Sequence, residues 1–160
     1  MSRNEAQTRR DLIDPILYKR GWHNHLVKVE VTPGKTDLIN GVPKKRKGRT
    51  DYLLCLPGSE TSSSPFPIAI LEAKKETDPP FLGLNQAVTY RERFNVPFTF
   101  STNGHLYCDA SSDLKNIKES LKLNEFPSPE QIKKRYEKHT NLNLNDDLLK
   151  PLFTPYKGGD

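Results

Sequence analysis

Two acidic residues and a lysine lie at the ends of two apolar segments that are expected to pair as strands. Asp51 precedes the segment 52–56, and Glu72 and Lys74 follow the segment 68–71. Side chains two residues apart on a strand project to the same face, so Glu72 and Lys74 point together. If 52–56 and 68–74 form a hairpin around the loop 57–66, residue 56 pairs with about 67, and residue 51 with about 72. The sequence therefore predicts that the two carboxylates meet.

Paired carboxylates beside a lysine are suited to metal-assisted hydrolysis of a phosphodiester. Two adjacent carboxylates repel each other unless a cation lies between them. Mg²⁺ prefers oxygen ligands and keeps several waters when protein carboxylates bind it. Such an ion polarises a phosphodiester and activates a water, and a lysine orients that water or stabilises the developing charge. The Glu-x-Lys spacing alone is also typical of a strand end that emerges into solvent, and that alternative stays open at this level.

The segments around these residues indicate an α/β protein with a mixed central sheet flanked by helices. Asn4 is the expected N-cap of the first helix and Gly21 its expected stop, while Pro15 predicts a kink or a fresh helical start after Asp14. Helices are expected over residues 4–20, 81–95, 113–123 and 128–139. Strands are expected over residues 27–31, 52–56, 68–74, 97–102 and 105–109.

Composition excludes several classes of protein. The chain has 160 residues, of which 34% are hydrophobic, and its mean hydropathy of -0.74 indicates one polar globular domain. No apolar stretch approaches the ~20 residues of a spanning helix, and the N-terminus lacks the apolar region of a secretory signal. Cys55 and Cys108 lie in apolar segments and are expected to be reduced core thiols of a cytoplasmic protein, with a disulfide as the alternative that stays open. A membrane protein, a secreted disulfide scaffold and a coiled coil are thereby excluded.

The basic character of the chain is local. Residues 1–110 contain 16 Lys and Arg against 12 Asp and Glu, and five of those positive charges lie within residues 44–49. These five are Lys44, Lys45, Arg46, Lys47 and Arg49, called the basic cluster below. A concentrated patch of this kind is typical of a loop that contacts phosphates, although a solvated surface loop has the same composition.

Several blocks of the sequence resemble one known family. GRTDYLLCL, PIAILEAKKE and LNQAVTYRERFNVPFTFSTNGH are similar to the N-terminal nuclease domain of the restriction (R, or HsdR) subunit of type I restriction–modification enzymes. EAQTRRDLIDPILYKRGW and FPSPEQIKKRY are also similar to that domain, so the resemblance covers about residues 3–137. The family belongs to the PD-(D/E)XK nuclease superfamily, which implies a restriction-endonuclease-like core.

The resemblance implies roles for the residues at the strand ends. Asp51 matches the metal-binding aspartate, Glu72 the second metal ligand, and Lys74 the catalytic lysine. The backbone carbonyl of Ala73 is expected to complete the metal site. Thr50 stands where the superfamily motif has proline, a position at which many members vary.

Three further residues match supporting positions of the family. Gln86 and Tyr90 match its Gln-x-x-x-Tyr motif, and a spacing of four residues places both on one helical face. Tyr90 is equally consistent with simple packing of the helix on the sheet. Glu5 occupies a position near the metal in related nucleases, although an acidic residue also stabilises the first turn of a helix.

As a whole, the resemblance implies a type I site-specific deoxyribonuclease domain that requires Mg²⁺, with Mn²⁺ as a substitute, and cuts double-stranded DNA in the cytoplasm. ATP would act only through a motor domain outside these residues, and the expected partners are the specificity and methyltransferase subunits, with no membrane. The nuclease domain is expected over 1–140, with a core at about 3–112, a helical extension at about 113–140, and a polar tail or linker over 141–160. Two alternatives stay open: a catalytically idle DNA-binding or subunit-docking module of the same fold, and a PD-(D/E)XK nuclease of DNA repair.

Overall fold

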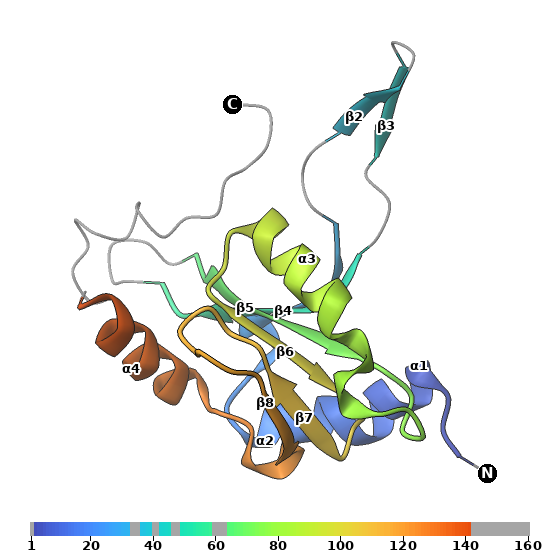
Figure 1. The fold of residues 1–160 in the computed structure, drawn as a ribbon, viewed down its shortest axis with the longest axis vertical. Coiled ribbons are helices and arrows are strands. Elements are labelled where there is room, and N and C mark those ends of the chain that lie inside the picture. Colours follow the sequence, from blue (N-terminus) through green and yellow to red (C-terminus); the bar gives the residue numbers. More distant parts are fainter. Residues whose placement is uncertain (1, 33–35, 40–41, 46–48, 59–63, 142–160) are drawn as a thin grey trace.

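The computed structural model of the chain describes residues 2–32, 36–39, 42–45, 49–58 and 64–141, with the backbone alone for 36–39 and 42–45 (Figure 1). Its helical elements are α1 (Glu5–Thr8), the π-helical turn η1 (Arg9–Ile13), α2 (Asp14–Lys19), η2 (Asn24–Leu26), η3 (Pro80–Gly83), α3 (Leu84–Phe94), η4 (Leu123–Glu125) and α4 (Pro129–Thr140). Its strands are β1 (Val27–Val31), β2 (Thr36–Ile39), β3 (Val42–Lys45), β4 (Thr50–Leu56), β5 (Phe66–Ala73), β6 (Phe98–Thr102), β7 (Leu106–Asp109) and β8 (Lys118–Lys122).

Six strands form one mixed sheet in the order β1-β4-β5-β6-β7-β8. β5 and β6 are parallel, because α3 carries the chain back between them, and the other neighbouring pairs in this sheet are antiparallel. β2 and β3 form a separate antiparallel pair, where the sequence led us to expect no strands. The predicted α/β class with a mixed sheet is confirmed.

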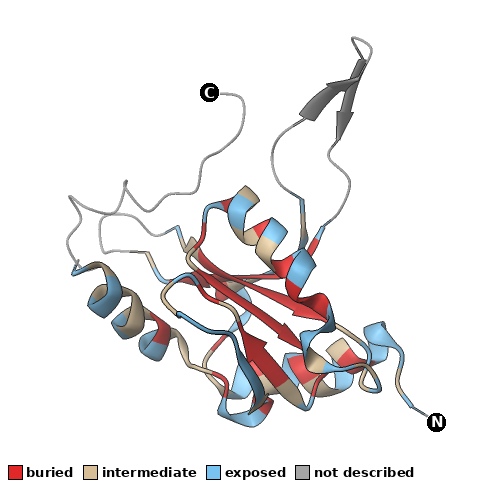
Figure 2. Ribbon diagram, in the orientation of Figure 1, coloured by how far each residue is buried: buried red, intermediate tan, exposed pale blue. Residues whose placement is uncertain are grey.

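The sheet is covered on both faces, and the sequence of β4 shows why (Figures 1 and 2). Leu53 and Cys55 pack with Ile70 of β5 and with Ala87 and Phe94 of α3. The alternate residues of β4 and β5 pack instead with α2 and α4 on the opposite face, in a cluster that includes Tyr52, Leu54, Leu71, Leu17 and Ile132. A central strand buried on both faces needs a continuous apolar run rather than an alternating one.

The first helix contains an irregular turn. Asn4 caps α1 through a capping box with Gln7, as predicted for the N-cap. The chain then widens into the π-helical turn η1, in which the Asp14 amide bonds to the Arg9 carbonyl, before α2 starts at Asp14 with Pro15 in its first turn. Gly21 follows the last turn with φ 99°, a conformation that favours glycine. The predicted stop is confirmed, whereas the backbone stays helical through Ile13 and Asp14, so the irregularity before Pro15 is a widened turn rather than a fresh start.

One predicted helix is wrong. Residues 113–123 form turns followed by β8 and the start of η4 rather than a helix. β8 pairs with β7 at the edge of the sheet, and Leu121 packs against the main core cluster. Backbone hydrogen bonds to an open sheet edge, and burial of one leucine, outweigh the helical propensity of a charged segment.

Both cysteines are buried free thiols, as predicted. Burial raises the pKa of Cys55 to about 11, so this thiol stays protonated at neutral pH. None of the helices in the described part of the chain has the length and apolar composition needed to cross a membrane.

Candidate functional site

Asp51 and Glu72 lie opposite each other at one end of the β4–β5 hairpin. Tyr52 pairs with Leu71 and Leu54 with Ala69, and the same register places Asp51 opposite Glu72. The hairpin therefore brings the two carboxylates together as predicted. The register shifts by one residue between Leu54 and Cys55, so Leu56 pairs with Phe66 rather than with residue 67.

Each carboxylate has one oxygen anchored by hydrogen bonds. Oδ2 of Asp51 accepts the backbone N–H of Ala73 at 2.8 Å. Oε1 of Glu72 accepts the Thr50 hydroxyl at 2.8 Å and the Asp51 backbone N–H at 3.1 Å. Neither Oδ1 of Asp51 nor Oε2 of Glu72 accepts a hydrogen bond from an N–H or hydroxyl group of the described residues. Each side chain is thus held in place through one oxygen, and the two carboxyl groups lie within hydrogen-bond range of each other.

The environment of Glu72 disfavours its charged form. The residue is 1% exposed. Burial, followed by the hydrogen bond and the charge of the adjacent Asp51 carboxyl group, raises the pKa of Glu72 to about 9. A cation at this position would compensate both the burial and the repulsion.

Lys74 lies beside the pair, on the face covered by η3 and the start of α3. Its backbone N–H donates to the Thr102 carbonyl of β6 at 2.8 Å, which fixes the end of β5. Gly83 leaves space for the Lys74 side chain, because a Cβ atom there would lie 3.4 Å from Lys74 Cε and 3.2 Å from Glu72 Cβ. Glu72 and Lys74 therefore project to the same face of β5, as their spacing of two residues predicts.

The turn η3 is itself anchored to the sheet. The Ser101 hydroxyl of β6 donates to the Pro80 carbonyl at 2.7 Å and accepts the Gly83 N–H at 3.1 Å. Ser101 pairs with Glu72 across the parallel strands. The wall of the site next to Lys74 is thus tied to the strand beside it.

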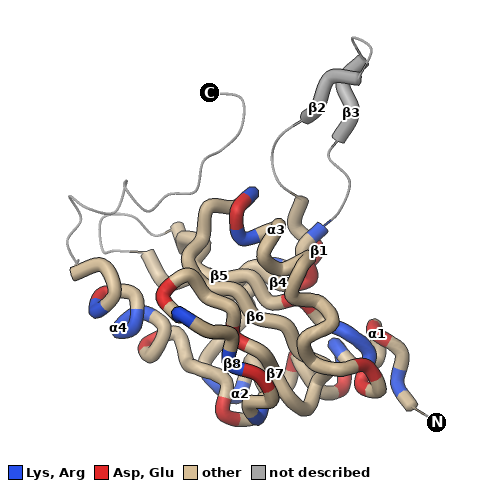
Figure 3. The backbone as a smooth tube through the Cα atoms, in the orientation of Figure 1, with Lys and Arg blue, Asp and Glu red and all other residues tan. Residues whose placement is uncertain are grey.

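The first helix contributes charges of both signs, and acidic and basic positions gather beside α1 (Figure 3). Burial and then the nearby Asp51 carboxylate raise the pKa of Glu5, while Lys74 and Arg9 lower it. Glu5 therefore lies within electrostatic range of Asp51, and its place near a metal stays a prediction. The guanidinium of Arg9 lies 3.7 Å from Asp51 Oδ1 and 3.3 Å from the Glu30 carboxylate.

The predicted Gln86–Tyr90 pair shares one face of α3. The Gln86 amide donates to the Tyr90 hydroxyl at 3.4 Å. Gln86 is exposed, whereas Tyr90 is buried and packs with the core residues Leu53 and Ile70. Within the described residues, no hydrogen bond or ion pair joins this pair to Asp51, Glu72 or Lys74.

Most of the basic cluster cannot be placed beside the site. The side chains of Lys44 and Lys45, and all of Arg46 and Lys47, lie outside the described residues. Arg49 directly precedes β4, is exposed, and forms a 3.8 Å ion pair with Glu30. It is the described member of the cluster, two residues from Asp51.

The donor set fits a divalent cation that keeps part of its water shell. Two carboxylates, each anchored through one oxygen, are present, and the Ala73 carbonyl follows Glu72 directly. Among the described residues, no group of three or more His, Cys, Asp and Glu side chains is close enough together to hold a metal ion. A pair of carboxylates is the donor set that Mg²⁺ takes from proteins when it keeps several waters.

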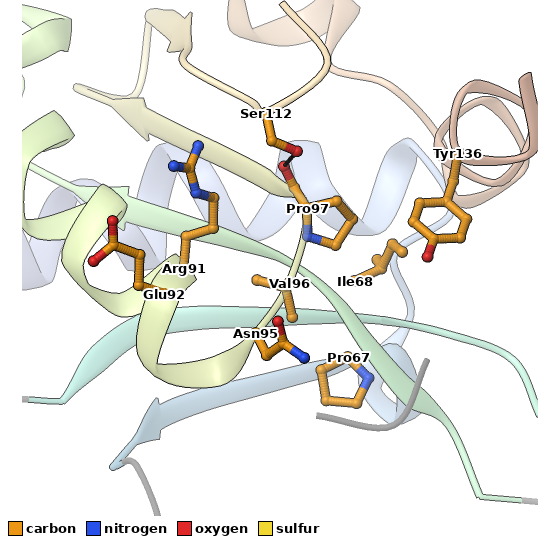
Figure 4. Close-up of a pocket in the computed structure, with 9 residues that line it drawn as sticks. All are labelled: Pro67, Ile68, Arg91, Glu92, Asn95, Val96, Pro97, Ser112 and Tyr136. Carbon is orange, nitrogen blue, oxygen red and sulfur yellow. Dashed lines mark hydrogen bonds between the residues drawn. The ribbon is translucent and has the colours of Figure 1, made fainter. Parts of the chain in front are cut away.

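A cavity of about 450 Å³ lies elsewhere (Figure 4). It is lined by residues at the start of β5, by the loop after α3, and by Tyr136 of α4. Pro67 and Ile68 form part of its wall, whereas Glu72 lies toward the other end of the same strand. The cavity and the carboxylate pair are thus separate features.

Sequence reasoning missed Arg9, Glu30, Gly83 and Ser101. Arg9 follows Glu5 by four residues, a spacing that places both on one helical face, so this signal was present in the sequence. Glu30 and Ser101 carry no such signal, because only the strand order places them next to Asp51 and Glu72.

The chain is similar to subunits of type I restriction enzymes. It is 26% identical over 140 residues to the type I restriction enzyme EcoAI endonuclease subunit of Escherichia coli. It also matches the structure of a fragment of an HsdR subunit of a type I restriction enzyme from Vibrio vulnificus YJ016, with 30% sequence identity and a TM-score of 0.72 over 98% of this chain. The chain is a homologue of type I restriction enzyme HsdR subunits.

The HsdR homology covers most of this chain but a small part of its relatives. The matched region is 82% of this chain and 16% of the Escherichia coli subunit, and the chain covers 29% of the Vibrio vulnificus HsdR fragment. No protein-family model matches the chain. The HsdR match and the mixed sheet both agree with a restriction-endonuclease-like fold.

Proposed function

We propose that this chain is the metal-dependent endonuclease domain of a type I restriction subunit and hydrolyses phosphodiester bonds of double-stranded DNA. The observation that carries the proposal is the Asp51–Glu72 pair, anchored through one oxygen each and placed beside Lys74. Homology to HsdR subunits supports the reaction class, because the Escherichia coli relative is named as an endonuclease subunit. The whole set corresponds to the superfamily pattern, with Thr50 in place of its proline.

Asp51 and Glu72, with the Ala73 carbonyl, would hold Mg²⁺, and Mn²⁺ would substitute for it. When bound, the ion would supply Lewis-acid polarisation of the scissile phosphate and a more nucleophilic water. Lys74 would orient the attacking water or stabilise the charge that develops on the phosphate. Glu5 lies within electrostatic range of the same site and would interact with the metal's water shell.

The Gln86–Tyr90 pair would support Lys74 and the DNA from α3.

The surface beside Asp51 and Glu72 would bind the DNA backbone. Arg49 is exposed two residues from Asp51, and the other members of the basic cluster precede it in the chain. Arginine and lysine side chains bind phosphates without reading the sequence. We therefore propose that the chain contacts DNA through the basic cluster without selecting a sequence.

The remaining functions of the system would reside outside these residues. By homology, a motor domain would use ATP to translocate DNA, and specificity and methyltransferase subunits would select the target, in the cytoplasm. If other subunits select the target sequence, this chain needs to contact only the DNA backbone and not the bases. Cutting of DNA by this chain would also depend on those neighbouring domains.

The first experiment titrates Mn²⁺ into the chain with a short DNA duplex present, and compares wild type with Asp51→Asn and Glu72→Gln. Both substitutions preserve an acceptor oxygen for the anchoring hydrogen bonds, so the fold should persist. Glu119→Gln, at an exposed position on β8, is the matched control. Loss of Mn²⁺ binding in both site variants, with binding retained in Glu119→Gln, would support the proposal.

Cleavage of duplex DNA is then measured in the complete restriction complex, and Lys74→Met is compared with Lys75→Met. Lys75 is exposed and adjacent in sequence, so it controls for loss of one positive charge. Only Lys74→Met should abolish cutting while leaving metal binding intact. Absence of Mn²⁺ binding in the wild type would favour a non-catalytic docking module.

A further inference from the structure

We propose that Arg9 is a positioning residue of the site, placed by the π-helical turn η1 and acting through Asp51. This inference rests on the proposed function, because it assigns Arg9 to the proposed metal ligand. The Arg9 side chain is 18% exposed, and its guanidinium forms an ion pair with Asp51. In this role Arg9 holds Oδ1 of Asp51 in a fixed direction.

Arg9 is itself held on three sides. Its Nη1 donates to the Glu30 carboxylate at 3.3 Å, and its guanidinium carbon lies 5.1 Å from the centre of the Tyr52 ring. Its Nη1 lies 3.7 Å from Asp51 Oδ1, which is an ion pair but is too long for a hydrogen bond. Arg9 thus attracts Oδ1 without occupying its lone pairs, which stay available to a cation.

The strand β1 contributes to this arrangement. Val29 pairs with Tyr52 and Val31 with Thr50, so Glu30 lies opposite Asp51. Glu30 has φ 53°, a left-handed conformation that is uncommon and strained for a residue with a side chain. Its carboxylate reaches Arg9 and Arg49 from this position. Strain beside a candidate site is consistent with a constraint imposed by function.

The π-helical turn explains why Arg9 is available at this place. The turn closes with the Asp14 amide bonded to the Arg9 carbonyl, so residues five apart become neighbours along the helix. Asp14 accepts the Tyr52 hydroxyl at 2.5 Å, while Arg9 packs over the ring of the same tyrosine. Both ends of the turn are thereby attached to Tyr52, the residue after Asp51. Widened turns of this kind are frequent at functional sites.

Positioning and plain electrostatics predict opposite effects, which makes the inference testable. A positive charge near a cation site repels the cation, so its removal alone would tighten metal binding. If Arg9 positions Asp51, its removal weakens metal binding instead. Loss of a residue that orients a metal ligand typically costs 10–100-fold in metal affinity.

The experiment measures the Mn²⁺ dissociation constant of the full 160-residue chain with duplex DNA present, for wild type, Arg9→Met and Arg9→Lys. Arg10→Met is the matched control, since Arg10 is adjacent and exposed and pairs with Asp11 alone among the described residues. We expect Arg9→Met to weaken Mn²⁺ binding by about 10–100-fold. Arg9→Lys should recover part of this affinity, and Arg10→Met should leave the constant within about two-fold of the wild-type value. Circular dichroism of each variant checks that the fold persists.

The outcomes separate this inference from the proposed function. If the wild type binds Mn²⁺ and Arg9→Met binds it equally or more tightly, the positioning role is wrong and the proposed function stands. If Arg9→Met unfolds, the Mn²⁺ dissociation constants of Glu30→Gln and Tyr52→Phe, which alter the two groups that hold Arg9, test the inference instead. Unchanged Mn²⁺ binding in both variants would overturn the positioning role of Arg9. If the wild type itself binds no Mn²⁺, the proposed metal site and the role of Arg9 fall together.

Discussion

Asp51 and Glu72 are linked through the backbone as well as through their charges: the Asp51 N–H donates to Glu72 Oε1 at 3.1 Å, and Asp51 Oδ2 accepts the N–H of Ala73. The two strands therefore hold both carboxylates next to each other. Such a pair is costly to ionise without a cation, and the pKa of Glu72, raised to about 9, expresses that cost.

The raised pKa makes the stability of the metal-free fold depend on pH. Because the pKa of Glu72 in the fold lies above its ordinary value of 4.5, its protonated form is favoured in the folded state. The contribution of Glu72 to the free energy of unfolding is fully present below pH 4.5 and is lost as pH rises toward 9. Glu72→Gln keeps the acceptor for Thr50 and removes the charge. We expect it to raise the free energy of unfolding at about pH 8 by at least about 1 kcal/mol, and to have little effect at about pH 4.5.

Urea denaturation in EDTA at the two pH values checks this prediction, with Glu119→Gln as the control. Mn²⁺ should reverse the order at about pH 8 by stabilising the wild type more than Glu72→Gln. A lower stability of Glu72→Gln than of wild type at the higher pH without metal would contradict the interpretation.

Gly83→Ala should damage the site more than the fold. The added Cβ would lie 2.8 Å from the Ser101 hydroxyl and 3.2 Å from Glu72 Cβ, so the turn η3 or the end of β5 must shift. We expect stability to fall by about 1–3 kcal/mol and Mn²⁺ binding to weaken at least about tenfold. Asn85→Ala, at an exposed position in the first turn of α3, is the control for both measurements.

Arg135→Met should destabilise the protein without changing the metal site. Arg135 of α4 donates two hydrogen bonds to Asp113 at 2.6 Å and one to Asp109 at 2.8 Å, and both aspartates are largely buried. Its removal leaves two carboxylates without their cation, which costs about 3 kcal/mol. Thermal unfolding should show this destabilisation for Arg135→Met and not for its neighbour Lys134→Met. Equal melting temperatures for the two variants would contradict the assigned role.

Replacement of Lys44, Lys45, Arg46 and Lys47 by glutamine should weaken binding to all DNA sequences alike. The slope of log Kd against log salt concentration should fall by about 0.9 for each phosphate that these side chains no longer neutralise. Binding of two unrelated duplexes across a salt series checks this. An equal number of lysines elsewhere, Lys115, Lys118, Lys122 and Lys134, provides the control. An unchanged salt slope would exclude the basic cluster from the DNA interface.

The carboxylate pair could be predicted because its geometry is local in sequence. Asp51 and Glu72 belong to one hairpin, and counting back from its loop gives their pairing. The predicted pairing of residues 56 and 67 is one residue out, since the bulge at Leu54 and Cys55 shifts that end of the ladder. The error does not reach the carboxylates.

The contacts of Arg9 and Ser101 could not be predicted for the opposite reason. Arg9 meets Glu30 and Asp51 because β1 adds to the edge of β4, and Ser101 meets Gly83 because β6 pairs in parallel with β5. Strand order is a property of the whole chain, and local spacing does not encode it. The incorrect prediction of a helix over residues 113–123 has the same cause. This charged segment forms a strand because the unpaired edge of β7 is next to it, and the strand order that places it there is not visible in local spacing.

The bulge between Leu54 and Cys55 has a consequence for how the hairpin tolerates changes in length. A slip of one residue along a continuous ladder would turn every side chain of β5 to the other face of the sheet. Here the extra residue is accommodated at the bulge, between the loop and the carboxylates. We therefore expect that a change in the length of the connection between β4 and β5 leaves Asp51 opposite Glu72, because the bulge separates the two carboxylates from the loop.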